Sequence, residues 1–275
     1  VLIDATELAD VAAMAGVPFD TGMESRHDTG EDVAPEKANG IIQDLTYVAI
    51  LRSDPASDME RPEGYDPDEF ACCAVNSRCS SPKEPDRMWK PGQMLTYGRL
   101  PGGKYMINWP IEGNDFYADL TAMNADERHA ALEQAKARTM RFVYFMRREL
   151  GMDSLIVDRG IYPTADGLPL IPYHREGRRI HGAVRFTLPY IEQPYSQPQP
   201  LYRTAIAVGD YPVDQHHTRY DGAEALPDLH FHPVPSWGLP AGVMLPADVD
   251  GLLVAERGIS VSNVVNGTTR LQPVV

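Results

Sequence analysis

Residues 251–275, GLLVAERGISVSNVVNGTTRLQPVV, decide which fold class the chain suggests. The apolar run Leu252–Ala255 predicts a buried strand, and the stretch after it predicts a loop. Small residues let backbone amides approach a large flat ligand at the carboxyl end of a strand. Composition leaves a plain surface loop with an exposed arginine as an equal alternative. The loop carries Gly258, Ser260, Ser262, Asn263, Asn266, Gly267, Thr268 and Thr269, and Arg270 follows them.

Residues 1–16, VLIDATELADVAAMAG, show a related pattern. Val1–Ile3 predicts a strand buried on both faces, as in a parallel sheet, and Asp4-Ala5-Thr6 predicts a turn. Apolar residues then recur at helical spacing until Gly16 ends the helix. A strand, a tight turn and a short helix are parts of an α/β layer, so we expect both stretches to belong to such a layer.

The bulk composition limits the classes of partner. The chain has 275 residues, 43% hydrophobic and 23% charged, as in an ordinary soluble globular protein. A net charge of −14 argues against nucleic acid and against an anionic membrane surface. No apolar run reaches the ~18 residues that a bilayer requires. We expect a small-molecule partner and favour a cytoplasmic location, and the oligomeric state stays open.

The middle of the chain mixes irregular segments with a few clear elements. We expect residues 20–98 to be largely irregular, with a helix at about 34–50 and strand-like pieces at 46–51. The clearest helix is Ala125–Leu150, because Asn124 and Glu127 form a capping box and Gly151 follows its end. Further strands are predicted at Leu155–Val157, Ile180–Leu188 and Thr204–Val208.

Three cysteines are too few for a disulfide framework, and their spacing is no zinc signature. We favour free thiols at Cys72, Cys73 and Cys79. A single bridge from Cys79 to Cys72 or Cys73 is the alternative.

Two polar groups are candidates for chemistry. Residues 174–182, HREGRRIHG, hold the arginines Arg175, Arg178 and Arg179, which suit anions, although a structural role in Arg–Glu pairs is favoured. Imidazoles titrate near neutrality, so a proton-shuttling histidine is favoured over a metal site in the second group. That group consists of Asp214, His216, His217, His230 and His232.

The C-terminal stretch resembles the terminal flavin-binding signature of a family of FAD-dependent oxidoreductases, the xanthan-lyase-related flavoproteins. The segments VLIDATELADVAAMAG, YGRLPGGKYMINWP, LIVDRGIYPTADGLPLIPYHREGRRIHG and VGDYPVDQHH resemble other parts of the family in the same order. The resemblance implies FAD as cofactor and hydride transfer from a small polar, sugar-like substrate to the flavin. It places the following residues beside the cofactor: Ala5, Thr6, Gly258, Ile259, Ser260, Gly267, Arg270 and Pro273. The candidate catalytic residues are His216, His217 and Arg175.

The expected fold class is α/β with an α+β cap. Residues 1–34 and 246–275 are expected to be remnants of a Rossmann-like FAD/NAD(P)-binding domain, and residues 35–245 a mixed-sheet substrate or cap domain. The chain lacks the G-x-G-x-x-G unit that binds a pyrophosphate, so a fragment of a longer enzyme is the simplest account. The alternatives are a non-catalytic binding or scaffold protein that keeps the fold, and a flavin-independent carbohydrate-active lyase.

Overall fold

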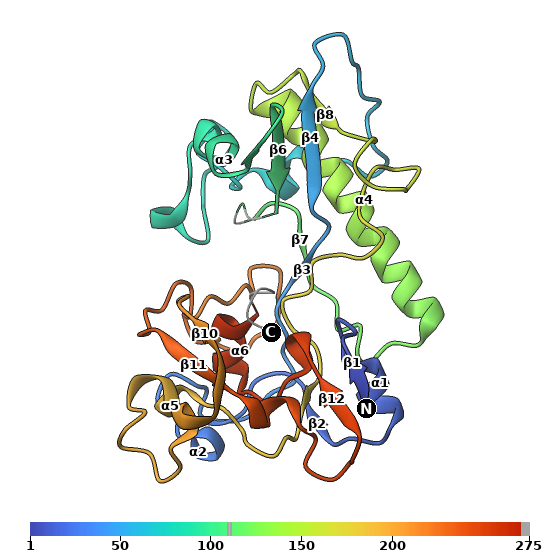
Figure 1. Cartoon of the computed structure of the whole chain (residues 1–275). Coiled ribbons are helices and arrows are strands. Elements are labelled where there is room, and N and C mark those ends of the chain that lie inside the picture. Colours follow the sequence, from blue (N-terminus) through green and yellow to red (C-terminus); the bar gives the residue numbers. More distant parts are fainter. Residues whose placement is uncertain (109, 111, 271–275) are drawn as a thin grey trace. The chain divides into compact units, whose positions relative to one another are not determined.

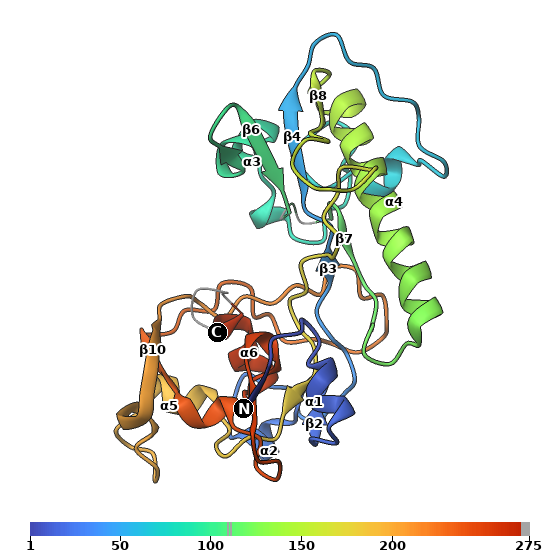
Figure 2. The ribbon, with the colours of Figure 1, turned by 45° about the vertical axis from the view of Figure 1, so that its right-hand side comes forward.

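The computed structural model describes residues 1–108, 110 and 112–270. By internal contacts the chain forms two compact units, which we call the terminal unit and the central unit. The terminal unit comprises Val1–Gln43, His174–His217 and Gly222–Val275, and the central unit comprises Asp44–Tyr173 and Thr218–Asp221. Both consist of small sheets and short helices, with one long helix in the central unit (Figures 1 and 2). This mixed architecture agrees with an α+β fold.

Strands close to the two ends of the chain lie side by side as a parallel pair (Figure 1). Strand β1 (Leu2–Asp4) pairs with β12 (Leu252–Val254), which confirms both predicted strands. The prediction that β1 is buried on both faces is wrong, because Leu2 is 57% exposed and Ile3 is 60% exposed. A single described strand, β12, pairs with β1, so only Asp4 at its end is buried.

Helix α1 (Asp10–Met14) follows β1, and Gly16 lies just beyond it with a positive φ of 78°. Glycine adopts this conformation without steric cost, so the predicted helix end is confirmed. The apolar residues of this region form a small core cluster of Ala9, Ala12, Val17, Ile180, Leu252 and Val254.

The other described residues of the terminal unit include two antiparallel strand pairs and three short α-helices. Strand β2 pairs with β9, and β10 pairs with β11. The predicted strand at Thr204–Val208 is confirmed by β10, but the predicted strand at Ile180–Leu188 does not continue past Ile180. The bounds are β2 Phe19–Asp20, α2 Arg26–Thr29, β9 Arg179–Ile180, α5 Leu188–Glu192, β10 Ala205–Gly209, β11 Trp237–Pro240 and α6 Asn263–Thr269.

Helix α6 replaces part of the loop predicted after residue 258. Ser262 caps it, because its hydroxyl oxygen accepts a hydrogen bond from the backbone N–H of Val265 at 3.1 Å. Val264 and Val265 are buried in the main core cluster of the unit, beside Trp237. Burial of this apolar side outweighs the low helix propensity of its Asn, Gly and Thr residues.

The central unit holds a four-stranded antiparallel sheet in the order β5-β6-β4-β8. The strand-like pieces predicted at 46–51 are confirmed, whereas the helix predicted at 34–50 is wrong. Ile50 pairs with Met106 and Leu51 with both Tyr105 and Val157, so sheet pairing decides this segment. The bounds are β3 Leu45–Thr46, β4 Ala49–Ser53, α3 Pro91–Tyr97, β5 Arg99–Leu100, β6 Lys104–Ile107, β7 Asp115–Phe116 and β8 Leu155–Val157.

Helix α4 (Ala125–Glu149) confirms the long predicted helix (Figure 2). The side chain of Asn124 accepts hydrogen bonds from the backbone N–H groups of Asp126 and Glu127, and the Glu127 carboxylate accepts the N–H of Asn124 at 2.9 Å. The buried face of α4 includes Phe142 and Met146.

Short 3₁₀ turns occur in both units. They lie at Pro67–Phe70, Pro85–Arg87, Leu201–Thr204, Ala241–Met244 and Glu256–Gly258.

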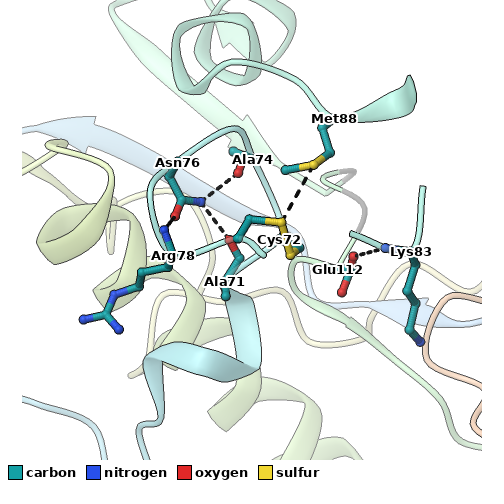
Figure 3. Close-up of a disulfide and its surroundings, with 9 residues drawn as sticks. Ala71, Cys72, Ala74, Asn76, Arg78, Lys83, Met88 and Glu112 are labelled. Carbon is teal, nitrogen blue, oxygen red and sulfur yellow. Dashed lines mark hydrogen bonds between the residues drawn. A yellow bond between two sulfur atoms is a disulfide. The ribbon is translucent and has the colours of Figure 1, made fainter. Parts of the chain in front are cut away.

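Cys72 and Cys79 form a disulfide (Figure 3). Cys73 is a buried free thiol. The preference for three free thiols was therefore wrong. The loop closed by the bridge is also held by the amide of Asn76, which donates to the carbonyls of Ala71 and Ala74 at 2.7 Å each. Disulfides are uncommon in the reducing cytosol, and the cytoplasmic location stays a prediction.

The compact units have other boundaries than the predicted domains, because residues 174–217 lie with the two ends of the chain. Which residues form a cofactor domain and which a cap stays a prediction. No described helix combines the length and the apolar character that a membrane span needs.

Candidate functional site

The turn after β1 is organised by the buried carboxylate of Asp4. Its Oδ1 accepts hydrogen bonds from the backbone N–H of Thr6 at 2.9 Å and from the Thr6 hydroxyl at 2.6 Å. Its Oδ2 accepts the N–H of Ala12 at 2.7 Å. Because Asp4 is turned inward and hydrogen-bonded, the turn presents the backbone of the exposed Ala5 and the half-buried Thr6 rather than a carboxylate.

The segment after β12 is closely packed against the rest of the terminal unit. A Cβ atom at Gly258 would lie 2.8 Å from Cβ of Ala9 and 2.8 Å from Cγ1 of Val254, so this position requires glycine. Ile259 is buried, and the hydroxyl of Ser260 accepts the N–H of Gly182 at 3.0 Å. Contacts within the chain thus explain these small residues, and their contact with a cofactor stays a prediction.

Gly267 brings helix α6 close to the segment that contains Asp214. A Cβ atom at Gly267 would lie 2.9 Å from Cγ1 of Val213, and the carbonyl of Gly267 accepts the N–H of Asp214 at 3.2 Å. Helix α6 therefore places Arg270 beside Asp214. Pro273, the remaining predicted cofactor residue, lies outside the described residues.

The basic run 174–182 is built into the interior of the terminal unit. Arg179 pairs with Glu176 and lies 2.9 Å from a carboxylate oxygen of Glu24. Arg178 donates to the carbonyl of Leu8 at 2.9 Å. These contacts show a structural role for both arginines. Arg175 is buried as well, and its carbonyl accepts the side-chain amide of Asn266 at 2.9 Å.

Asp214 is the centre of a polar cluster. Its Oδ2 lies 2.5 Å from Nη2 of Arg270 and accepts the hydroxyl of Tyr211 at 3.0 Å. Nε2 of His216 lies 3.3 Å from the same oxygen, and Nδ1 of His230 lies 3.0 Å from Oδ1. We call these five residues the Asp214 cluster. It brings together a predicted catalytic histidine, His216, and a predicted cofactor-binding arginine, Arg270.

Backbone pairing fixes the segments that carry the cluster. Val213 and His232 form an antiparallel bridge in which each N–H donates to the other's carbonyl at 2.9 Å. The N–H of Gln215 donates to the carbonyl of Leu229 at 3.0 Å. Asp214 and His230 are therefore held on neighbouring extended segments. His232 does not join them, because its Nε2 lies 4.0 Å from Glu192 instead.

The electrostatics of the cluster keep Asp214 ionised. Burial alone would raise the pKa of this carboxyl. The imidazoles of His216 and His230 and the charge of Arg270 outweigh burial and lower the pKa well below its usual range. The result is a buried carboxylate whose charge is balanced by a guanidinium.

His217, the second predicted catalytic histidine, points to other partners. Its Nδ1 lies 3.1 Å from the carbonyl oxygen of Ile42, and its Nε2 lies 3.3 Å from Oε1 of Gln215. Burial lowers the pKa of His217 to about 4, so the ring is neutral near pH 7. The amide nitrogen of Gln215 donates to the backbone carbonyl and the side-chain oxygen of Asn263, which fixes the orientation of Gln215.

The comparison with protein families decides the class. The family described as FAD dependent oxidoreductase matches residues 1–275. The chain belongs to this family. No curated protein and no solved structure matches the chain. The cofactor of this FAD-dependent oxidoreductase is FAD.

The edge at which β1 and β12 end side by side is where a cofactor of this oxidoreductase is expected. In open α/β sheets, ligands bind outside the carboxyl ends of parallel strands, and here β1 and β12 end side by side. The inward hydrogen bonds of Asp4 turn its carboxylate away from that edge, which suits a cofactor that carries phosphates. Ala5 and Thr6 are the predicted cofactor residues on this edge.

Sequence reasoning placed Asp214 and His230 in one group of possible metal ligands and proton-shuttling histidines, but gave them no part in a cluster with Arg270. No local pattern could have joined them, because Arg270 follows Asp214 by 56 residues. The useful signal would have been an aspartate two residues before a histidine, since a carboxylate commonly orients a working imidazole.

Proposed function

We propose that this protein oxidises a small polar substrate of the polyhydroxylated, sugar-like class by transferring a hydride from a C–H bond to FAD. The family match over residues 1–275 supports the oxidoreductase class and the cofactor. The substrate class rests on the resemblance to xanthan-lyase-related flavoproteins. When bound, FAD supplies the two-electron acceptor. The observation that carries the assignment of residues is the contact between Asp214 and His216.

Oxidation of an alcohol carbon removes a hydride and leaves a hydroxyl proton that a base must accept. His216 is the residue to which we assign this proton. A carboxylate beside one ring nitrogen fixes the tautomer of an imidazole and stabilises the imidazolium that forms. Asp214 is placed for this task, because its Oδ2 lies 3.3 Å from Nε2 of His216 and its charge is held by Arg270.

His217 and Arg175 suit this role less well. His217 is a weak base, because burial lowers its pKa to about 4 and both ring nitrogens face oxygens of Ile42 and Gln215. Arg175 is buried, and its carbonyl holds Asn266 on helix α6. We therefore propose that Arg175 helps to position α6 and that His217 helps to fix residues 42 and 215.

The parallel strands β1 and β12 are the proposed cofactor side of the protein. We infer that β1, β12 and the turn at Ala5 and Thr6 belong to a Rossmann-like FAD-binding layer. Gly258, Ile259, Ser260 and Gly267 shape its inner packing. The same proposal includes a glycine-rich unit for the pyrophosphate outside residues 1–275, because none of the glycines here lies between a parallel strand and a helix in the G-x-G-x-x-G pattern.

The test is anaerobic reduction of the FAD-loaded protein by a panel of sugars and polyols. The loss of flavin absorbance measures the rate of reduction. We expect His216→Gln to slow reduction by roughly 100-fold or more while FAD remains bound. The matched control is His129→Gln on the exposed surface of α4, which should leave the rate unchanged.

Two results would count against the proposal in different ways. A wild-type protein that retains FAD but is reduced by no polyhydroxylated compound would refute the substrate class. A His216→Gln protein that is reduced as fast as the wild type would refute the assignment of the proton to His216 and leave the oxidoreductase class standing.

A further inference from the structure

The Asp214 cluster contains three side chains of the types that bind transition metals. The carboxylate of Asp214 and one ring nitrogen each from His216 and His230 lie within 4.8 Å of one another. Two imidazoles and one carboxylate are a donor set typical of zinc and of other divalent first-row ions, whereas magnesium and calcium prefer oxygen ligands alone. The chemistry of the donors thus selects the class of ion.

The positions of the donors are fixed by the backbone rather than by flexible side chains alone. The bridge between Val213 and His232 and the hydrogen bond from Gln215 to Leu229 join the two segments that carry Asp214, His216 and His230. The imidazole rings of His216 and His230 lie with centroids 5.9 Å apart and planes at 72°. Because the backbone already fixes the donors, metal binding has to order fewer groups and its entropic cost is smaller.

The two carboxylate oxygens of Asp214 have different surroundings. Oδ2 is held by Arg270 and Tyr211. Oδ1 is buried and accepts no aligned hydrogen bond from the described residues, although Nδ1 of His230 lies 3.0 Å away. Carboxylates that ligate zinc commonly have their second oxygen hydrogen-bonded to the protein, which is the arrangement that Arg270 and Tyr211 provide.

We propose that Asp214, His216 and His230 form a binding site for a divalent transition-metal ion of the zinc class. Asp214 coordinates through Oδ1 and each histidine through one ring nitrogen. The side chains of His216 and His230 are 11% and 18% exposed, so an ion can enter from solvent and keep a water-derived ligand. Because Arg270 already balances the charge of Asp214, a divalent ion would add two positive charges to the cluster, and a bound hydroxide would reduce this excess to one.

His216 belongs both to the proposed metal site and to the proposed reaction. Where His216 accepts the substrate proton, a metal ion on the same ring competes with that proton, so zinc would inhibit the oxidoreductase. This consequence rests on the proposed function, whereas the metal site itself does not. The closing experiment therefore measures binding in the absence of substrate.

The test is equilibrium dialysis of the chelator-treated, FAD-loaded protein against Zn²⁺, with the metal content of the protein measured by mass spectrometry. We expect one high-affinity ion per chain. His230→Gln should weaken its binding by roughly 10-fold or more, since loss even of a supporting residue around a metal costs that much. His232→Gln is the matched control and should bind as the wild type does, because His232 lies beside Glu192.

A second measurement guards against a His230→Gln variant that fails to fold. The wild-type protein loaded with one equivalent of Cu²⁺ should give an electron paramagnetic resonance spectrum with splitting from two nitrogen ligands. Absence of that splitting, or equal Zn²⁺ affinity in wild type and a folded His230→Gln variant, would overturn the proposed site. Neither outcome bears on whether sugars reduce the flavin.

Discussion

Nη2 of Arg270 lies 2.5 Å from Oδ2 of Asp214, and both side chains are only 4% exposed. This ion pair joins the end of helix α6 to the segment that carries His216. Breaking a buried ion pair from one side leaves an uncompensated charge in the interior, which is costlier than the pair is worth. The pair therefore links the stability of the terminal unit to the geometry of the candidate site.

Arg270→Met should lower the free energy of unfolding by about 3 kcal/mol, because it leaves the carboxylate of Asp214 without its guanidinium. The double variant Asp214→Asn with Arg270→Met should lose less than the sum of the two single variants. Urea denaturation measures the free energy of unfolding of the wild type, the two single variants and the double variant. Arg148→Ala is the control, since Arg148 makes an exposed pair with Asp58 and an exposed contact with the ring of Tyr144, and a loss below about 1 kcal/mol is expected. Strictly additive losses would show that Asp214 and Arg270 do not interact in solution.

The cysteines give a direct chemical test of the central unit. The chain has three cysteines, and Cys72 and Cys79 are bridged, so the unfolded and unreduced protein should show one free thiol. Reduction should raise the count to three. Replacing both bridged residues by serine should cost about 2 kcal/mol, the chain-entropy value for so short a loop. Three thiols before reduction would contradict the bridge.

Cys73 should be chemically inert in the native protein. Burial raises the pKa of its thiol to about 12, and only the thiolate reacts with alkylating agents. Iodoacetamide at pH 8 should therefore leave Cys73 unmodified for as long as the central unit is folded, and should modify it at once in urea. Peptide mapping after each treatment measures the fraction of Cys73 that is alkylated. Rapid native labelling would show that the segment around Cys73 opens readily.

The features that the sequence revealed least are those that contacts between distant residues determine. Local patterns predicted α4, β8, β10 and β12, because periodicity and caps are properties of neighbouring residues. They missed helix α6, since its residues favour helix weakly and burial of Val264 and Val265 decides its conformation. They also missed the pairing of Asp214 with Arg270, because contacts between distant residues depend on how the whole unit packs.

Gly258 tests which contacts determine the shape of the segment after β12. Gly258→Ala should destabilise the terminal unit by about 1–3 kcal/mol, because the new methyl group would lie 2.8 Å from side-chain atoms of Ala9 and Val254. Gly40→Ala is the control, since its Cβ would meet nothing within 4 Å. Urea denaturation with and without FAD compares the variants. If Gly258→Ala lost FAD while keeping wild-type stability, glycine would be needed there for the cofactor rather than for packing.

Glu31 and Glu24 are buried glutamates that should give the terminal unit opposite responses to pH. Burial raises the pKa of Glu31 above its ordinary value of 4.5, and its Oε2 has no hydrogen-bond partner among the described residues. Burial alone would raise the pKa of Glu24 too, but the charge of Arg179 and hydrogen bonds from Arg179 and Asn263 outweigh it and lower the pKa.

Proton linkage determines whether each glutamate stabilises the folded protein more at low or at high pH. The contribution of Glu31 is fully present below pH 4.5 and is lost as the pH rises through its raised folded-state pKa. That of Glu24 is present above pH 4.5 and is lost as the pH falls through its lowered pKa. We expect urea denaturation at pH values below and above 4.5 to show that Glu31→Gln loses less stability than the wild type as the pH rises. Glu24→Gln should instead be destabilised at neutral pH and show less additional loss in acid. Identical pH profiles for the two variants would mean that the burial of Glu31 and the pairing of Glu24 with Arg179 do not hold in solution.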